Sequence, residues 1–508
     1  MPSKPDKPGK PGMARPPAGA RPRAWEARAE RFFAGRLAYL AVSVALLAPC
    51  YWQPRIQAGD LSSHIYNSWL AQLIESGHAQ GLIVAPQTTN VLFDLILGGL
   101  FRALGAEAAQ RIAVSLAVLI FVWGAFAFIS AVAGRRAWNL MPCIAMLAYG
   151  WVFHMGFFNF YMALGMCFWA MAAAWNPRPT RLAAAAGFLA LAYVAHALPV
   201  VWCLFLLAYV ALARNRSPRA RAYLTLGVLA LMAVVRVWAT MAFSARWYPE
   251  QLTRITGADQ VWVFDAKYYV AMVGLLFLWG VLFLNLIRTW GASRVFTSIP
   301  FQVFIMSAGG ILILPATVFI PGFLHALAFI AERMSLGVGI CVCALLAAAR
   351  PRPFERYAML ALALMFFAFL YRDERVLNGF EDRMDGAVAR IAPGQRVVSL
   401  VDDPDLRVNA ITHMIDRACL GRCYSFANYE PSTAQFRVRV VAANPIVVKT
   451  YGESWNLQTG AYVVKAADEP LYAVDLDESG QVIVRTLKAG TVCGSTYWKI
   501  LPDLAPLS

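Results

Sequence analysis

Residues 110–136 decide the fold class of this chain, and they read QRIAVSLAVLIFVWGAFAFISAVAGRR. Between Arg111 and Arg135 there is no charged side chain. A helix of about 20 apolar residues crosses the hydrocarbon core of a bilayer. Basic residues directly after such a run are typical of the cytoplasmic end of a span. The stretch therefore predicts a transmembrane helix that ends in the cytoplasm.

The composition extends this prediction to most of the 508 residues. The chain is 59% hydrophobic and 15% charged, with a mean hydropathy of +0.54. An average soluble domain is about half apolar and about a quarter charged. A chain so poor in charge cannot cover a water-facing surface, and it is too apolar to be disordered along most of its length. We therefore expect an α-helical polytopic membrane protein.

Apolar runs long enough to be considered as spans recur along residues 37–371, the predicted transmembrane domain. About eleven are found, near 37–52, 110–133, 137–153, 159–175, 182–195, 198–213, 222–243, 268–288, 296–318, 333–349 and 356–371. Residues 1–36 before them are basic and rich in Pro and Gly, and predict a disordered cytoplasmic arm. No small-residue cleavage site follows the first run, so we expect that run to stay as a helix.

The basic residues fix the predicted orientation. With the N-terminus in the cytoplasm, the arm and the inner loops carry 22 Lys or Arg and 4 acidic residues, counting Arg288 and Arg356 at the loop edges. These loops are 134–136, 176–181, 214–221, 289–294 and 350–355. The outer loops of the membrane region are nearly free of basic residues, which is the positive-inside pattern. The formal net charge of +16 therefore records orientation, and we expect no nucleic-acid partner.

An odd number of spans places residues 372–508 outside the membrane, where the composition becomes that of a soluble α+β domain. A helix is expected over 403–419, and a hairpin turn at Asp477–Gly480. Strands are expected over 396–401, 436–441, 446–451, 461–465, 471–476 and 481–487. Disulfides are permitted in an exported domain. One bridge is expected among Cys419, Cys423 and Cys493, and the sequence leaves the pairing open.

The first outer loop, residues 53–109, is long, and loops of that length are usually functional. Residues 61–75 predict an amphipathic helix along the membrane face, with Leu61, Ile65 and Trp69 in its apolar stripe. Asp60 stands just before that helix and His64 lies on its polar side. Asp60 is either an N-cap or a chemical group, and the sequence leaves both readings open. Residues 90–104 predict a second amphipathic helix.

The Gly59-Asp60 segment and the run Asn159-Phe160-Tyr161-x-x-Leu164-Gly165 resemble bacterial members of the GT-C superfamily of membrane glycosyltransferases. One span, a long outer loop with an early Asp, about eleven spans in total and an external C-terminal domain are similar to that architecture. The resemblance implies transfer of a sugar from a polyprenyl-phosphate to a glycan, lipid or protein acceptor, outside the bacterial cytoplasmic membrane. Gly-Asp-Leu replaces the paired acidic residues of well-known members, so use of a divalent metal is left open.

The resemblance also implies roles for polar residues that gather at the outer ends of the spans. Asp60 and His64 are the predicted catalytic residues, with Asp60 as the base. The predicted ligands of the donor phosphate are Arg236, Arg246, Lys267 and Arg333. Further cavity candidates are His154, Asn159, His196, His325 and Glu332. The competing structural readings are interfacial helix ends, snorkelling cations and a Glu332–Arg333 ion pair.

Two other classes of protein compete with the glycosyltransferase prediction. A transporter or lipid flippase would also be polytopic. Such proteins often show inverted repeats and midplane charges, whereas here no repeat is found and the polar residues gather outward. A membrane sensor with an exported binding domain is the third class.

Overall fold

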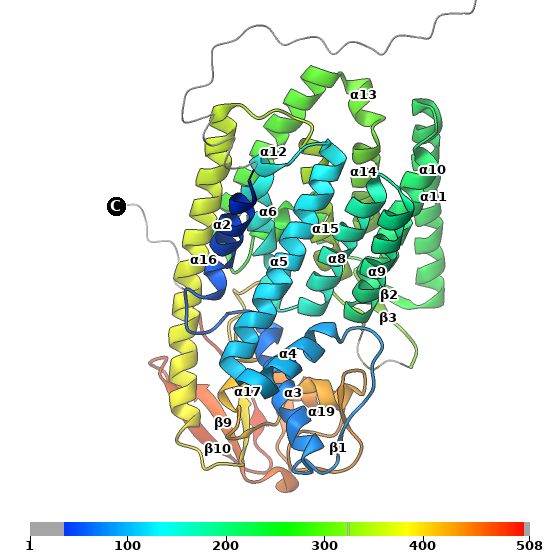
Figure 1. Cartoon of the computed structure of the whole chain (residues 1–508). Coiled ribbons are helices and arrows are strands. Elements are labelled where there is room, and N and C mark those ends of the chain that lie inside the picture. The colour runs from blue at the N-terminus through cyan, green and yellow to red at the C-terminus, as the bar shows by residue number, and fades with distance from the viewer. Residues whose placement is uncertain (1–34, 323, 325, 502–508) are drawn as a thin grey trace, which may run out of the picture. The chain divides into compact units, whose positions relative to one another are not determined.

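The computed structural model describes residues 35–322, 324 and 326–501 (Figure 1). The chain divides into two compact units, Met1–Leu46 and Leu47–Ser508. The described part of the first unit is the start of the apolar helix α2 (Arg36–Leu47). The predicted arm over 1–36 lies almost wholly outside the described residues.

The second unit is mostly helical, with strands in its C-terminal part. Five stretches among the described residues are long and apolar enough to cross a membrane. They are α5 (Ala106–Ala133), α8 (Phe158–Trp175), α11 (Pro218–Ala242), residues Ala266–Trp290, and α16 (Pro353–Val388). The fourth joins the short turn η5 (Ala266–Tyr268) to α12 (Tyr269–Trp290). Shorter apolar helices are α9 (Pro179–Ala195), α10 (Ala197–Ala213) and α14 (Ile299–Ile313). The chain is thus a helical membrane protein.

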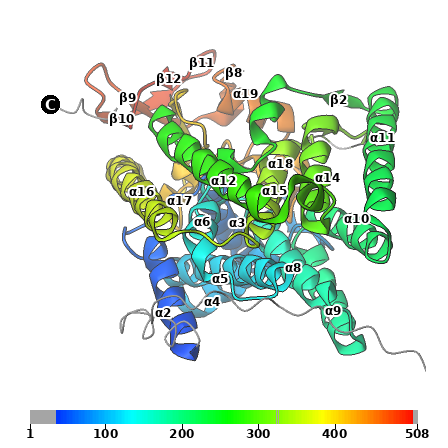
Figure 2. The same ribbon diagram turned by 90° about the horizontal axis from the view of Figure 1, so that it is seen from above.

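Glycine lets two of the long helices pack closely. A Cβ atom added to Gly124 of α5 would stand 2.3 Å from the Gly165 carbonyl oxygen of α8. Small residues at such a contact let helix backbones approach, which favours helix association in lipid. Figure 2, which looks from above, shows α5 and α8 side by side near the lower edge, with α12 and α15 (Ile330–Leu346) beyond them.

One predicted span is wrong, and one predicted helix is longer than expected. The span expected over 137–153 is broken into η2 (Trp138–Leu140), α6 (Met141–Ala148) and α7 (Trp151–Met155). The break falls at Gly150, where an added Cβ would meet the Gln260 carbonyl oxygen at 2.8 Å. Similarly, the span expected to end at 371 continues as α16 to Val388, so the expected domain boundary at 372 lies inside a helix.

Short strands organise the C-terminal part. β10 (Val482–Leu487), β9 (Leu471–Leu476), β4 (Arg396–Ser399) and β6 (Tyr424–Ser425) form one sheet in that order. β9 and β10 are antiparallel and joined by the expected turn, in which Gly480 N donates to the Asp477 carbonyl. β4 is parallel to both of its neighbours. Smaller pairs are β5 (Val401–Asp402) with β12 (Thr496–Tyr497) and β8 (Tyr462–Val463) with β11 (Val492–Cys493).

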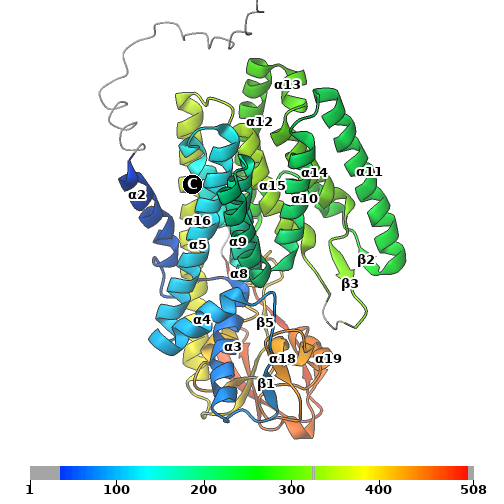
Figure 3. The same ribbon diagram turned by 45° about the vertical axis from the view of Figure 1, so that its right-hand side comes forward.

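Two further C-terminal predictions are wrong in extent. The helix expected over 403–419 is confined to α17 (Met414–Ala418), and 446–451 forms no strand. The other helices of this part are α18 (Tyr429–Thr433) and α19 (Tyr451–Gln458). Nearer the bundle, β2 (Ser244–Arg246) pairs with β3 (Thr317–Phe319), as Figure 3 shows below α11.

The first outer loop and the C-terminal part form one structure. The loop contains the two expected helices, α3 (Gly59–Glu75) and α4 (Leu92–Leu104), and between them β1 (Leu82–Val84). β1 pairs antiparallel with β7 (Val438–Val440), and α3 packs against α17. Leu61, Ser63 and Asn67 of α3 are all buried. C-terminal segments therefore cover the polar side of α3, a contact that the sequence did not predict.

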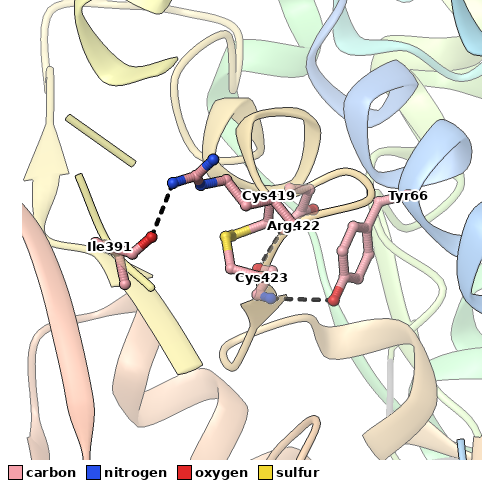
Figure 4. The surroundings of a disulfide bond; sticks show 7 residues. Tyr66, Ile391, Cys419, Arg422 and Cys423 are labelled. Atoms are coloured by element: carbon pink, nitrogen blue, oxygen red, sulfur yellow. Dashed lines mark hydrogen bonds between the residues drawn. A yellow bond between two sulfur atoms is a disulfide. The ribbon is translucent and has the colours of Figure 1, made fainter. Parts of the chain in front are cut away.

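A disulfide joins Cys419 to Cys423 just after α17, and Cys493 is a buried free thiol (Figure 4). The bridge closes a turn in which Cys423 N donates to the Cys419 carbonyl. Near it, Arg422 donates to the Ile391 carbonyl at 3.0 Å, and the Tyr66 hydroxyl of α3 accepts from Ser425 N. The Tyr66 contact joins this region to α3.

Candidate functional site

The first turn of α3 carries Asp60. The N-cap of this helix is Ala58, so Asp60 is the second helical residue and the N-cap reading is wrong. A carboxylate in the first turn is favoured by the helix dipole. Gly156 permits this placement, because a Cβ there would stand 2.6 Å from Asp60 N. The Asp60 side chain is 16% exposed, so it is partly accessible to a ligand.

A histidine from the C-terminal part faces Asp60. His413 Nε2 lies 3.8 Å from Asp60 Oδ1, and His413 Nδ1 lies 3.0 Å from Asp416 Oδ2. Asp416 also accepts a hydrogen bond from the Ser425 hydroxyl. Burial by itself would lower the pKa of His413, but the carboxylate of Asp416 and then that of Asp60 raise it above its ordinary value. The imidazole therefore lies between two carboxylates, hydrogen-bonded to Asp416 and 3.8 Å from Asp60.

A partly buried cation, Arg333, acts electrostatically on this acid. Arg333 stands in the first turn of α15, and its guanidinium stacks over the Phe157 ring at 4.0 Å. Arg333 Nε is buried and has no hydrogen-bond partner among the described residues. The guanidinium interacts electrostatically with Asp60 and with Tyr429, which itself feels both charges. The Asp60 carboxylate and the Arg333 guanidinium therefore interact with each other and with Tyr429.

A second polar group begins one helical turn further along α3. His64 Nδ1 lies 2.7 Å from Asp94 Oδ1 of α4, and Asn159 Nδ2 donates to Asp94 Oδ2 at 2.7 Å. The Asn159 carbonyl oxygen accepts from Phe93 N, which fixes the amide. Burial would lower the pKa of His64, yet the Asp94 carboxylate raises it to about 9. The pair is therefore a protonated imidazole and an ionised carboxylate at neutral pH.

Glu430 of α18 closes this group from the C-terminal side. It accepts from the Ser63 hydroxyl at 3.3 Å. Burial raises its pKa to about 8, with His64 opposing the shift and Asp94 and Asp60 adding to it. The carboxyl is thus mostly neutral at pH 7 and can donate as well as accept a hydrogen bond.

A pocket opens between these elements. Its empty volume, including the open solvent at its mouth, is ≈ 370 Å³. Its lining includes His64, Asp94 and Asn159 on one side and Glu430, Phe436 and Arg437 on the other. The pocket thus joins the first outer loop to the C-terminal part.

Several predicted site residues are engaged elsewhere. Lys267 Nζ pairs with Asp265 and Asp373, at 2.6 and 2.9 Å. Arg236 is half-buried and lies over the Trp247 ring, and Arg246 is exposed and lies over the Phe319 ring. Of the four predicted phosphate ligands, only Arg333 is thus placed with Asp60.

The other cavity candidates also have structural roles. His154 Nε2 lies 3.2 Å from Glu374 Oε1, and His196 caps α10 by accepting from Leu198 N. Glu332 pairs with Arg254 at 2.9 Å, so the expected Glu332–Arg333 ion pair is wrong. His325 lies outside the described residues.

Sequence reasoning missed most of the C-terminal contribution to the site. His413 was not singled out from the sequence, and neither were Asp416, Tyr429 and Glu430. Nothing local to these residues indicates contact with α3. Asp94 could have been found as the one acid in the predicted helix over 90–104.

Within the described ranges, no three His, Cys, Asp or Glu side chains are grouped so that they could hold a metal ion.

No family model, curated protein or solved structure matches the chain.

Proposed function

We propose that this protein is a GT-C-type membrane glycosyltransferase of the bacterial cytoplasmic membrane. It has about eleven spans, a cytoplasmic N-terminus and an extracytoplasmic C-terminal part. It moves a sugar from a polyprenyl-phosphate to an acceptor hydroxyl on the outer face. The observation that supports this best is the electrostatic interaction of Asp60 with Arg333, whose buried Nε atom has no hydrogen-bond partner among the described residues.

The two residues match the two needs of the reaction. The acceptor oxygen attacks the anomeric carbon, its proton passes to the Asp60 carboxylate, and the bond from that carbon to the phosphate oxygen breaks. The electron pair leaves with the phosphate, whose growing charge the Arg333 guanidinium stabilises. The His413 ring faces Asp60 at 3.8 Å, beyond hydrogen-bond distance, and Asp416 orients this imidazole.

Two variants test this assignment. Asp60→Asn removes the base but keeps the size of the side chain, and Arg333→Gln removes the cation. We expect each to lower transfer on the order of 10²-fold or more. The control is Glu250→Gln, an exposed carboxyl near the outer helix ends that has no ion pair among the described residues. Its transfer rate should equal that of the wild type.

The assay follows release of polyprenyl-phosphate from labelled polyprenyl-phosphate sugars by the purified full chain in nanodiscs, with envelope extract as the acceptor source. A folded Asp60→Asn protein that transfers at the wild-type rate would contradict the base assignment. If the labelled lipid instead crosses the bilayer with its sugar intact, the protein is a flippase and the proposal fails.

A further inference from the structure

Another pocket lies where the helical bundle meets the C-terminal part. Its volume open to water-sized molecules is ≈ 240 Å³. One side of its lining is formed by the turn η5 and the residue before it, and the other by the segments that follow β5 and β12. The charged members of the lining are Asp265, Lys267, Asp403, Asp405 and Lys499. The pocket therefore has room for a small charged group.

This pocket stands at one end of a candidate membrane span. The apolar stretch Ala266–Trp290 has 25 residues, and a helix of that length, at about 1.5 Å per residue, crosses a bilayer core of about 30 Å. Its first residue therefore lies near a membrane surface, whichever way the chain is oriented. Val270, Val273 and Phe277 share one face of α12 and are 54%, 57% and 69% exposed. An apolar face that lipid chains can cover thus begins three residues after Lys267.

The charges of the lining favour a cationic ligand group. Lys267 already pairs with two carboxylates, one of them in the lining. The other charged groups are the carboxylates of Asp403 and Asp405 and the ammonium of Lys499. Lys499 Nζ lies 3.9 Å from Asp405 Oδ2, and the two side chains are 47% and 61% exposed, so a ligand can reach both. Two carboxylates against one ammonium leave one negative charge in excess.

Asp403 adds to this preference. It is 5% exposed, and it accepts from Ile500 N at 2.8 Å and from Asp405 N at 3.1 Å. Burial raises the pKa of Asp403 above its ordinary value, these two hydrogen bonds oppose the shift, and the Asp405 carboxylate adds to it. A cation bound beside the two carboxylates would stabilise the ionised form of Asp403.

A primary ammonium joined to a phosphate matches this arrangement of charges. The ammonium has three N–H donors for the two carboxylates, and the phosphate can pair with Lys499. The apolar members of the lining are Ala266, Leu406 and Leu501, and they can contact the carbon atoms next to the phosphate. An anionic headgroup would instead meet the excess negative charge, and a quaternary ammonium has no N–H to donate.

We propose that this pocket binds the headgroup of a zwitterionic membrane phospholipid that carries a primary amine, of the phosphatidylethanolamine class. The acyl chains of this lipid lie along the exposed face of α12. The lipid thereby fastens the C-terminal part to the membrane surface at the start of that helix. This role goes beyond the proposed sugar transfer and does not depend on it.

The test measures lipid binding to the delipidated full-length protein in detergent by native mass spectrometry. Phosphatidylethanolamine, phosphatidylcholine and phosphatidylglycerol with identical acyl chains are titrated separately. Asp405→Asn removes a carboxylate and Lys499→Gln removes the ammonium, and both positions are exposed enough to tolerate the change. The matched controls are Glu478→Gln and Lys488→Gln, which are exposed and lie outside the pocket.

We expect the wild type and both controls to bind phosphatidylethanolamine at least ~10-fold more tightly than the other two lipids, and each pocket variant to lose most of this preference. Equal binding of the three lipids by the wild type overturns the inference, as does a preference that both pocket variants retain. Glycerophosphoethanolamine, which has no acyl chains, is titrated in the same way. Binding of this compound as tight as that of the lipid overturns the assignment to a membrane lipid.

Discussion

The protonation of His64 and Glu430 links the site to the stability of the protein. The pKa of His64 is raised from 6.5 to about 9 and that of Glu430 from 4.5 to about 8. At a pH between its ordinary and its raised pKa, each group is mostly protonated in the folded chain and mostly deprotonated in the unfolded chain. The free energy of unfolding therefore falls as pH rises through that range. The contribution of Glu430 is lost from pH 4.5 to about 8, and that of His64 from pH 6.5 to about 9.

The test is the midpoint of thermal unfolding in detergent, followed by tryptophan fluorescence. We expect the midpoint of the wild type to fall from pH 6.5 to 9. Asp94→Asn removes the charge that raises the pKa of His64 but keeps an acceptor for Asn159, so the fall above pH 8 should flatten. Glu478→Gln, an exposed carboxyl on the β9–β10 turn, is the control. Equal slopes for the wild type and Asp94→Asn would contradict the assigned coupling.

At the residue scale, the sequence located one side of the site better than the other. Asp60, His64 and Asn159 could be singled out because polar residues at the outer ends of apolar helices are uncommon, and this indicates a functional role. His413 and Glu430 could not, because their importance comes from contact with α3, which lies far away in the sequence. Lys267 was a wrong choice for a similar reason. Its partner Asp373 lies in a helix whose polar extension the sequence did not reveal.

The start of α3 depends on a close approach of two elements at Gly156, which has φ +84°. Gly156→Ala should therefore be costly in two ways. The left-handed backbone costs about 1–2 kcal/mol for a non-glycine residue. The new Cβ would also displace the α3 backbone at Asp60. The transfer rate of the folded protein should therefore fall, in addition to the loss of stability. Both are measured, by thermal unfolding and by the donor-release assay.

Gly134→Ala is the matched control for this element. Gly134 ends α5 with φ +66° and has open space around its Cβ position. It should show the backbone cost of about 1–2 kcal/mol without loss of transfer. If both variants lose transfer equally, the placement of Asp60 does not depend on the contact with Gly156.

At the element scale, helices with a clear apolar period were predictable, and short strands were less so. The helices over 61–75 and 90–104 are present, and so is the β9–β10 hairpin, because each is specified by its own residues. The pairing of β1 with β7 could not be read from the sequence, since three residues on each side carry no pattern of their own. The break at Gly150 also depends on a partner, Gln260, from elsewhere in the chain.

At the scale of the whole molecule, contacts bring the predicted inner loops together. Arg135, directly after α5, donates to the carbonyls of Ala347 and Ala349, just after α15. Asn285, near the end of α12, donates to Glu355 at the start of α16. Three of the basic segments identified from the sequence are therefore neighbours at one end of the bundle, as expected if all face the same side of the membrane.

The Cys419–Cys423 disulfide offers the sharpest test of which side that is. If the C-terminal part is extracytoplasmic, the bridge forms in cells, because the cytoplasm keeps thiols reduced. Cells are lysed in denaturant with a thiol-blocking alkylator, and the protein is then reduced and tagged with a mass-shifting maleimide. Two tags per chain are expected for the wild type and none for Cys419→Ser, whose remaining thiols are all blocked at lysis. No tag on the wild type would mean that the pair is reduced, and would place the C-terminal part and the proposed site in the cytoplasm.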